Sequence, residues 1–205
     1  MYFKIASLLF IIGFAVFCLW NRLTINRMAE LERRNERKFW EREREANSVR
    51  RKPIDHLDYI KIPDNLYFDL LPDHIETATC KTIIEGLRQS KILNLTGYTN
   101  TDLKMMYGTA NITKLSEYDQ NYTTLVTSLQ KWADILNDNN YEKEAVEIME
   151  FLVSTNADIG HTFRMLGKYY KEHSMEAELA ALIERAENLK SINNSHIAES
   201  IREIM

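Results

Sequence analysis

The sequence has few of the residues that break helices and form tight turns. Its 205 residues include only 6 glycines and 3 prolines. A fold of many short strands needs such residues at its turns, so their scarcity argues against an all-β architecture and favours helices. The length and the hydrophobic content of 45% are those of an ordinary globular domain and exclude little more.

Cysteine is equally scarce, with Cys18 and Cys80 as its two positions. Cys18 lies inside an apolar opening segment, where it can hardly meet Cys80. We therefore expect no internal disulfide.

The motifs of common catalytic and metal-binding sites are missing. The chain has no nucleophile elbow, phosphate loop, dinucleotide fingerprint or paired-cysteine metal site. His56 and His74 each lie between acidic residues, but without further ligands this spacing is typical of a polar loop. We therefore predict no catalytic residue, no cofactor and no metal site, and expect neither an enzyme nor a nucleic-acid-binding protein.

Charge is distributed unevenly along the chain. Residues 21–52 contain 11 Lys and Arg against 6 Asp and Glu, a balance of +5. Residues 53–205 contain 14 against 24, a balance of −10. A basic neck therefore joins an apolar head to an acidic body.

The apolar head has the length of a membrane span. Residues 5–20 carry no charge, and the stretch 2–20 is interrupted only by Lys4, whose long side chain can reach the interface. At 1.5 Å per residue this stretch extends about 28 Å, close to the hydrocarbon thickness of a bilayer. We predict a transmembrane anchor at residues 1–20, in contact with the membrane through residues 2–20.

A cleaved signal peptide is the main alternative, because it also begins with a positive residue and an apolar run. Bulky Phe17, Leu19 and Trp20 stand where small residues should precede a cleavage site. A lipoprotein signal would need a small residue in place of Phe17, directly before Cys18. These residues favour an uncleaved span.

Basic residues predict the orientation of this span, because they resist translocation. Lys4 alone precedes it, whereas six basic residues follow closely: Arg22, Arg27, Arg33, Arg34, Arg37 and Lys38. We expect a single-pass protein of the cell membrane with its N-terminus outside and its body in the cytoplasm.

Residues 21–52 are predicted to form a charged helical stalk that continues the span. Glu, Arg, Ala and Leu dominate, and opposite charges recur three or four residues apart, as in Arg37 and Glu41. The heptad pattern is poor, which argues for a single stalk over a coiled coil. The basic excess either attracts anionic lipid headgroups or only keeps the helix soluble, and both interpretations stay open.

Pro53 ends the stalk, because proline disfavours helix at the residue before it. A mostly extended linker is expected at residues 53–72, with a short strand at 59–62, where apolar and polar side chains alternate. Disorder is expected only around this linker. Residues 73–124 form a helical region of no assigned family, with helices at 79–93 and 101–118, the second capped by Thr101.

After Leu125 two blocks match at an offset of 34 residues. The pairs of like character are Leu129 with Phe163, Trp132 with Leu166, Ala133 with Gly167, Leu136 with Tyr170, Met149 with Ile183, and Leu152 with Ala186. This pattern resembles the tetratricopeptide repeat, although Leu179 stands where alanine is expected and both blocks lack the late proline. Residues 125–205 are thus expected to form helical hairpins of this kind. A last helix, capped by Asn194 or Ser195, would close the stack with an isoleucine stripe.

The resemblance implies a peptide-binding face lined by the first helix of each hairpin. Its positions in the second block are His161, Arg164, Lys168 and Lys171, spaced so that they share one helix face. In an acidic body this strip suits an acidic segment or the carboxylate terminus of a partner. An ordinary solvated helix face is the alternative.

The fold class expected is therefore mostly α: a transmembrane helix, a charged stalk helix and a helical-hairpin domain. The function expected is that of a membrane-anchored adaptor or scaffold, which binds a partner protein or peptide at the cytoplasmic membrane face. The alternative is a ligand-sensing or catalytic domain in residues 53–120.

Overall fold

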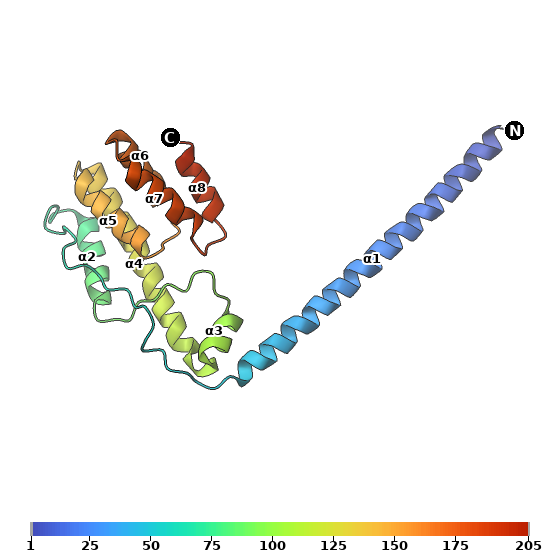
Figure 1. Ribbon diagram of the computed structural model, residues 1–205, viewed down its shortest axis with the longest axis horizontal. Coiled ribbons are helices and arrows are strands. Elements are labelled where there is room, and N and C mark those ends of the chain that lie inside the picture. Colours follow the sequence, from blue (N-terminus) through green and yellow to red (C-terminus); the bar gives the residue numbers. More distant parts are fainter. Residues whose placement is uncertain (1, 205) are drawn as a thin grey trace.

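The computed structural model describes the backbone of residues 2–204 and the side chains of residues 13, 14 and 16–204. Helices dominate residues 2–204 and no strand occurs among them, so the mostly α prediction is confirmed. The elements are α1 (Tyr2–Ser48), α2 (Ile75–Leu87), α3 (Asn100–Tyr107), η1 (Thr109–Asn111), α4 (Ile112–Asp138), α5 (Glu142–Ser154), α6 (Gly160–Glu172), α7 (Glu176–Glu187) and α8 (Asn194–Arg202) (Figure 1).

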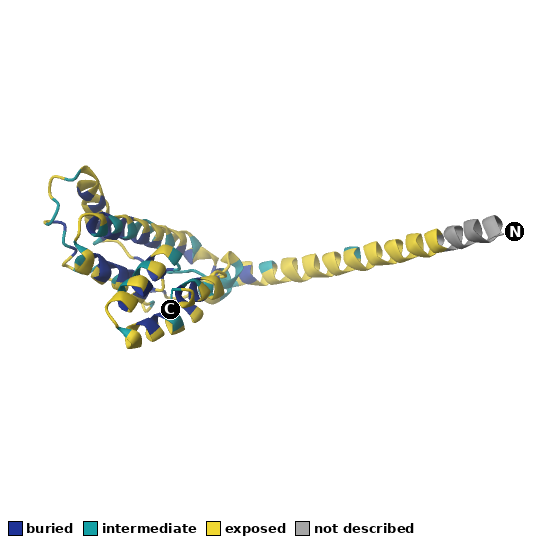
Figure 2. Cartoon of the chain, turned by 90° about the horizontal axis from the view of Figure 1, so that it is seen from above, coloured by how far each residue is buried: buried dark blue, intermediate teal, exposed yellow. Residues whose placement is uncertain are grey.

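Helix α1 leaves the body as a straight rod, and its described side chains are exposed over most of its length (Figure 2). The helix is continuous across the predicted anchor and stalk, and it ends at Ser48, before Pro53. The side chains of residues 1–12 and 15, which carry most of the predicted span, lie outside the described residues. Among the described residues, no helix combines the length and the apolar character needed to cross a membrane.

The last turns of α1 dock on α3 through ion pairs. The Lys104 ammonium donates to the Glu43 carboxylate, and the Thr101 hydroxyl donates to Glu43 Oε2 at 2.7 Å. Arg42 lies 2.5 Å from Asp102 Oδ1. The hydrogen bond from Lys104, followed by that from Thr101, lowers the pKa of Glu43, so this carboxyl is ionised at neutral pH. Complementary charges thus fix the base of the rod on the body.

The chain leaving α1 is held by one buried amide, that of Asn111, which is fully buried. Its Nδ2 donates to the carbonyls of Lys52 and Tyr107, both at 2.7 Å. Its Oδ1 accepts from Arg51 Nε at 3.2 Å. The Lys52 N–H also donates to the Tyr107 carbonyl at 3.0 Å. Arg51 and Lys52 therefore have a fixed backbone between α1 and α4.

The linker at 53–72 packs on the body, so the expectation of disorder there is wrong. Leu66 and Phe68 are buried in the main core, and the indole N–H of Trp132 donates to the Leu66 carbonyl at 2.6 Å. The rings of Phe68 and Trp132 are 5.4 Å apart. The predicted strand at 59–62 is also wrong. The Ile60 N–H donates to the Ile92 carbonyl, but the two segments form no strand ladder.

Two predicted helix boundaries shift. Helix α2 spans Ile75–Leu87 instead of 79–93, and the buried residues Ile92 and Leu93 belong to the following coil. Burial of apolar side chains does not by itself distinguish a helix from an irregular segment, which explains the error.

The predicted helix at 101–118 is divided into α3 and α4 by Gly108, whose φ is 83°. The cap of α3 is Thr99 instead of Thr101. Thr99 Oγ1 accepts from the Asp102 N–H, and the Asp102 carboxylate accepts from the Thr99 N–H, which makes a capping box. A threonine two residues earlier thus sets the start of the helix.

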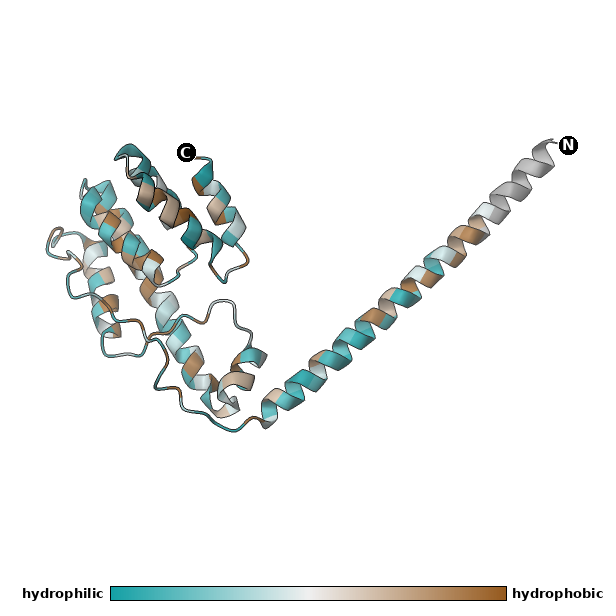
Figure 3. Ribbon diagram, viewed as in Figure 1, coloured by the Kyte–Doolittle hydropathy of each residue, from teal (hydrophilic) through white to brown (hydrophobic). Residues whose placement is uncertain are grey.

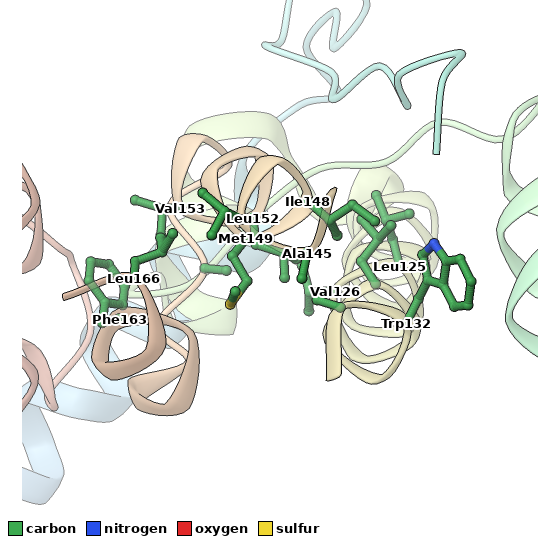
Figure 4. Packing of buried hydrophobic residues seen from close by; sticks show 14 of the residues in the cluster. Leu125, Val126, Trp132, Ala145, Ile148, Met149, Leu152, Val153, Phe163 and Leu166 are labelled. Atoms are coloured by element: carbon green, nitrogen blue, oxygen red, sulfur yellow. The ribbon is translucent and has the colours of Figure 1, made fainter. Parts of the chain in front are cut away.

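The core of the body joins α4 and α5 to α6. Figure 4 shows Ala145, Ile148, Met149, Leu152 and Val153 of α5 lying between Leu125 and Trp132 of α4 and Phe163 and Leu166 of α6. Figure 3 shows the hydrophobic residues of these helices alternating with polar residues along each ribbon. Each helix thus buries one apolar stripe.

The turns after α4 and α6 have the same geometry. Asn140 and Ser174, 34 residues apart, both have positive φ, at 66° and 56°. The next residue in each turn donates back into the helix, from Tyr141 to Leu136 at 2.9 Å and from Met175 to Tyr170 at 2.8 Å. These contacts satisfy the last carbonyls of both helices. The α4–α5 and α6–α7 hairpins thus turn alike.

Helix α8 packs on α6 at Gly167. A Cβ atom at Gly167 would lie 3.1 Å from Cγ2 of Ile201, so the missing side chain permits the close approach. Ile197 and Ile201 of α8 are buried, as the isoleucine stripe predicted. The predicted cap is wrong: Asn193 is the N-cap, and its side chain makes no capping hydrogen bond.

Candidate partner-binding surface

The four predicted binding residues lie on one exposed face of α6. His161, Arg164, Lys168 and Lys171 are all exposed. The opposite face of the same helix is buried, through Thr162, Phe163, Leu166, Gly167 and Tyr170. Packing of that apolar face fixes the direction in which the basic strip points.

The two ends of the strip contact neighbouring helices. His161 Nε2 lies 3.0 Å from Asp134 Oδ1 on α4. The Lys171 ammonium donates to the backbone carbonyl of Ile204, just after α8. Intramolecular contacts thus occupy His161 and Lys171, and the strip runs from α4 toward the end of α8.

The two central cations are the accessible ones. Lys168 Nζ lies 3.8 Å from Glu172 Oε1, a distance that indicates a weak and solvated pair. Among the described residues, no carboxylate lies within ion-pair distance of Arg164. Arg164 and Lys168 therefore remain available to an anionic group of a partner.

The structure adds two residues of α4 that the sequence reasoning missed. Gln130 Nε2 donates to Asp134 Oδ1 at 2.8 Å, and the Thr162 hydroxyl donates to Gln130 Oε1. Gln130 and Asp134 precede Arg164 and Lys168 by 34 residues, so the repeat offset itself could have identified them. At these equivalent positions α4 carries a polar and an acidic residue, whereas α6 carries two cations.

The cysteine and the histidines of the segment 53–120 are Cys80, His56 and His74. Burial raises the pKa of the Cys80 thiol, which keeps it protonated and unreactive. His56 is exposed. Across the part of the chain with described side chains, no three His, Cys, Asp or Glu residues are grouped to hold a metal ion.

Buried tyrosines in the body have structural roles. Burial raises the pKa of Tyr122 to about 12, and its hydroxyl accepts from Asn94 Nδ2 at 2.9 Å. Burial, followed by a hydrogen bond to Glu150, also raises the pKa of Tyr170. The Tyr170 hydroxyl donates to Glu150 Oε1 at 2.8 Å. Both phenols stay protonated at neutral pH, so neither acts as a base.

Comparison with known proteins found no match: no family model, curated protein or solved structure is similar to this chain. The function is therefore inferred from the chain's own residues.

Proposed function

We propose that the protein is a membrane-anchored adaptor that holds an acidic segment or a carboxylate terminus of a partner on the exposed strip of α6. Residues 2–20 are the anchor, the rest of α1 is the stalk, and the helical body carries the strip. The proposal rests on one observation: Arg164 and Lys168 are exposed on one helix face, and the one carboxylate described near them is that of Glu172, 3.8 Å from Lys168 Nζ. The body around them, residues 53–205, has a charge balance of −10.

The likeness of the two hairpins supports a repeat architecture of the tetratricopeptide kind. Their turns share the same positive-φ position and the same backward hydrogen bond, and the α5–α6 turn at Asn156 and Ala157 has both as well, so the repeat rests on the 34-residue sequence pattern. In such an architecture the first helices α4 and α6 line one face. Asp134 and His161, which bond across these two helices, lie on that face.

The anchor is supported by the composition of α1. Residues 5–20 carry no charge. Five large apolar side chains in this stretch are 58% to 73% exposed: Phe14, Val16, Phe17, Leu19 and Trp20. A continuous apolar surface of this kind is unfavourable in water and favourable against lipid tails.

The orientation is tested with reporters fused after Met205. With the body in the cytoplasm, a fluorescent protein fused there should fold and fluoresce, and a periplasmic phosphatase fused there should be inactive. The reason is the excess of Lys and Arg that follows residue 20. An active phosphatase with a dark fluorescent fusion would reverse the proposed topology.

The strip is tested by reversing its two accessible charges. Arg164→Glu with Lys168→Glu should weaken binding of a peptide with a free carboxylate terminus and acidic residues by at least about a hundredfold. Two charge-assisted hydrogen bonds of about 1.5 to 3 kcal/mol each would be lost. The thermal midpoint should barely change, because both side chains are exposed. Binding is measured by isothermal titration of the full chain against an acidic peptide library.

A matched control separates the strip from net charge. Lys143→Glu with Arg185→Glu makes the same change in charge on the second helices α5 and α7, where both residues are exposed. This control should bind as the unmodified chain does. Equal binding by both double variants would refute the strip as the docking site.

A further inference from the structure

A second basic surface lies where the stalk meets the body. An open cleft of about 400 Å³ is lined there by Arg51, Lys52, Pro53, Ile54, Asp55, Lys91, Lys114 and Tyr118. Four of these side chains are cationic and one is a carboxylate, which gives the lining a formal charge of +3. Arg51 and Lys52 end the basic neck, whereas Lys91 and Lys114 come from the body, whose charge balance is −10.

The cleft keeps most of its positive charge unneutralised. Lys91 Nζ bonds to Asp55 Oδ1 at 3.0 Å, which accounts for the single carboxylate. Arg51 bonds through Nε to the neutral Asn111, and Lys52 Nζ lies 3.4 Å from the carbonyl of Met105. For Lys114 the described residues provide no carboxylate within 4.0 Å. Three cations therefore lack an anionic partner.

Three of the four cations, Arg51, Lys91 and Lys114, act on a common point, the Asp55 carboxylate. The hydrogen bond and the charge of Lys91 lower the pKa of Asp55, and the charges of Lys114 and Arg51 lower it further. Lys114 also lies in the first turn of α4, where the N-terminal end of the helix adds positive partial charge. An anion placed in the cleft would interact favourably with all of these groups.

The backbone that carries the cations is fixed in advance. Asn111 and Tyr107 hold Arg51 and Lys52, as described above. The Lys91 carbonyl accepts from Asn121 Nδ2 at 3.0 Å. A fixed backbone reduces the conformational entropy lost on binding, because only the side-chain tips need to order.

We propose that this cleft binds a phosphate-bearing ligand through Arg51, Lys52 and Lys114, with Lys91 beside them. A phosphate or diphosphate group matches the lining better than a single carboxylate, because it brings two or more charges and several acceptor oxygens to three unpaired cations. The site combines Arg51 and Lys52, at the end of the stalk, with Lys91 and Lys114 of residues 53–120, and it is independent of the strip on α6.

The same phosphate chemistry is available from a soluble ligand or from a lipid headgroup. If residues 2–20 span the membrane, as proposed above, α1 continues from Trp20 to Ser48. At 1.5 Å per residue that distance is about 42 Å along the helix. An upright stalk therefore holds the cleft beyond the reach of headgroups in its own membrane, and a soluble ligand is favoured.

The experiment places the full chain in nanodiscs of phosphatidylcholine and titrates it with inorganic pyrophosphate at constant ionic strength. Saturable binding is expected, and Lys114→Glu should weaken it at least tenfold. Lys52→Glu should act in the same direction, and the double variant should abolish measurable binding. Lys143→Glu is the matched control, since it reverses an exposed lysine in the first turn of α5. It should leave binding unchanged.

Parallel nanodiscs that contain a phosphoinositide distinguish the two sources. Unchanged pyrophosphate binding there supports a soluble ligand. Competition by the lipid, sensitive to Lys114→Glu, supports the same phosphate site filled by a headgroup. Absence of binding in both kinds of disc, or equal effects of Lys114→Glu and Lys143→Glu, would overturn the proposal. Arg164→Glu with Lys168→Glu should not alter pyrophosphate binding, so failure here and failure of the adaptor role are separable.

Discussion

Replacing Trp132 with alanine is expected to lower the thermal midpoint of the full chain by roughly 8 to 30 °C. Trp132 is fully buried, and deletion of a buried tryptophan side chain typically costs about 3 to 5 kcal/mol. The carbonyl of Leu66 also loses its hydrogen bond from the indole, which adds about 1 to 3 kcal/mol if no water replaces it. For a chain of this length each 1 kcal/mol shifts the midpoint by about 2 to 4 °C. The midpoint is read from the helical circular dichroism signal in mild detergent.

Two further variants identify the cause of this loss. Trp132→Phe keeps an aromatic ring against Phe68 but removes the indole donor, so an intermediate loss is expected. Trp40→Ala removes the same type of side chain from α1, where it is 54% exposed, and should change stability by less than about 0.5 kcal/mol. If Trp132→Ala and Trp40→Ala melted alike, the packing of the linker on α4 would be wrong.

Trp132 also shows where the sequence was informative and where it was not. The repeat pattern identified it as one of the large residues of the first block, and it is fully buried. Periodicity cannot show what covers such a residue, because its partners Leu66 and Phe68 come from an irregular segment 64 to 66 positions earlier. Helical periods describe one element at a time, whereas the linker packs through isolated apolar residues without any period.

Helix ends were predicted less well than helices, for a local reason. Thr99 and Thr101 are both acceptable caps by residue type. The choice falls on Thr99 because Asp102 three positions later completes the capping box. Likewise, a single glycine among helix-forming residues does not by itself end a helix, and its effect at Gly108 depends on a backbone contact from a distant part of the chain.

The two candidate sites also differ in how far a local sequence pattern predicts them. The strip on α6 follows from spacing within one helix, so the exposed face of His161, Arg164, Lys168 and Lys171 could be predicted from the sequence. Their hydrogen bonds to α4 and to the end of α8 could not. The basic cleft at the junction combines residues 51–55 with Lys91 and Lys114, and those segments meet only through tertiary packing. No local pattern contains such a site.

Replacing Gly108 with alanine is expected to open the segment 50–52, where the chain passes from the stalk to the body. Gly108 has φ 83° and ψ 149°, a conformation that costs a residue with a side chain about 1 to 3 kcal/mol. An added Cβ would lie 2.5 Å from the carbonyl oxygen of Arg50 and 2.9 Å from Cα of Arg51, so the two backbones must separate. The hydrogen bond from the Lys52 N–H to the Tyr107 carbonyl would then be strained or lost.

This local opening is measured as tryptic cleavage after Arg50 and Arg51, because proteases cut segments that open locally. A cost of 1 to 3 kcal/mol should raise the rate of cleavage at these two sites by roughly five- to 150-fold. Gly86→Ala is the matched control: no atom lies within 4 Å of its Cβ position in α2, and alanine should stabilise that helix by up to about 1 kcal/mol. Cleavage that rises equally in both variants would show that Gly108 does not hold the junction.

Since the same backbone positions Arg51 and Lys52, Gly108→Ala should also weaken pyrophosphate binding, whereas Gly86→Ala should not.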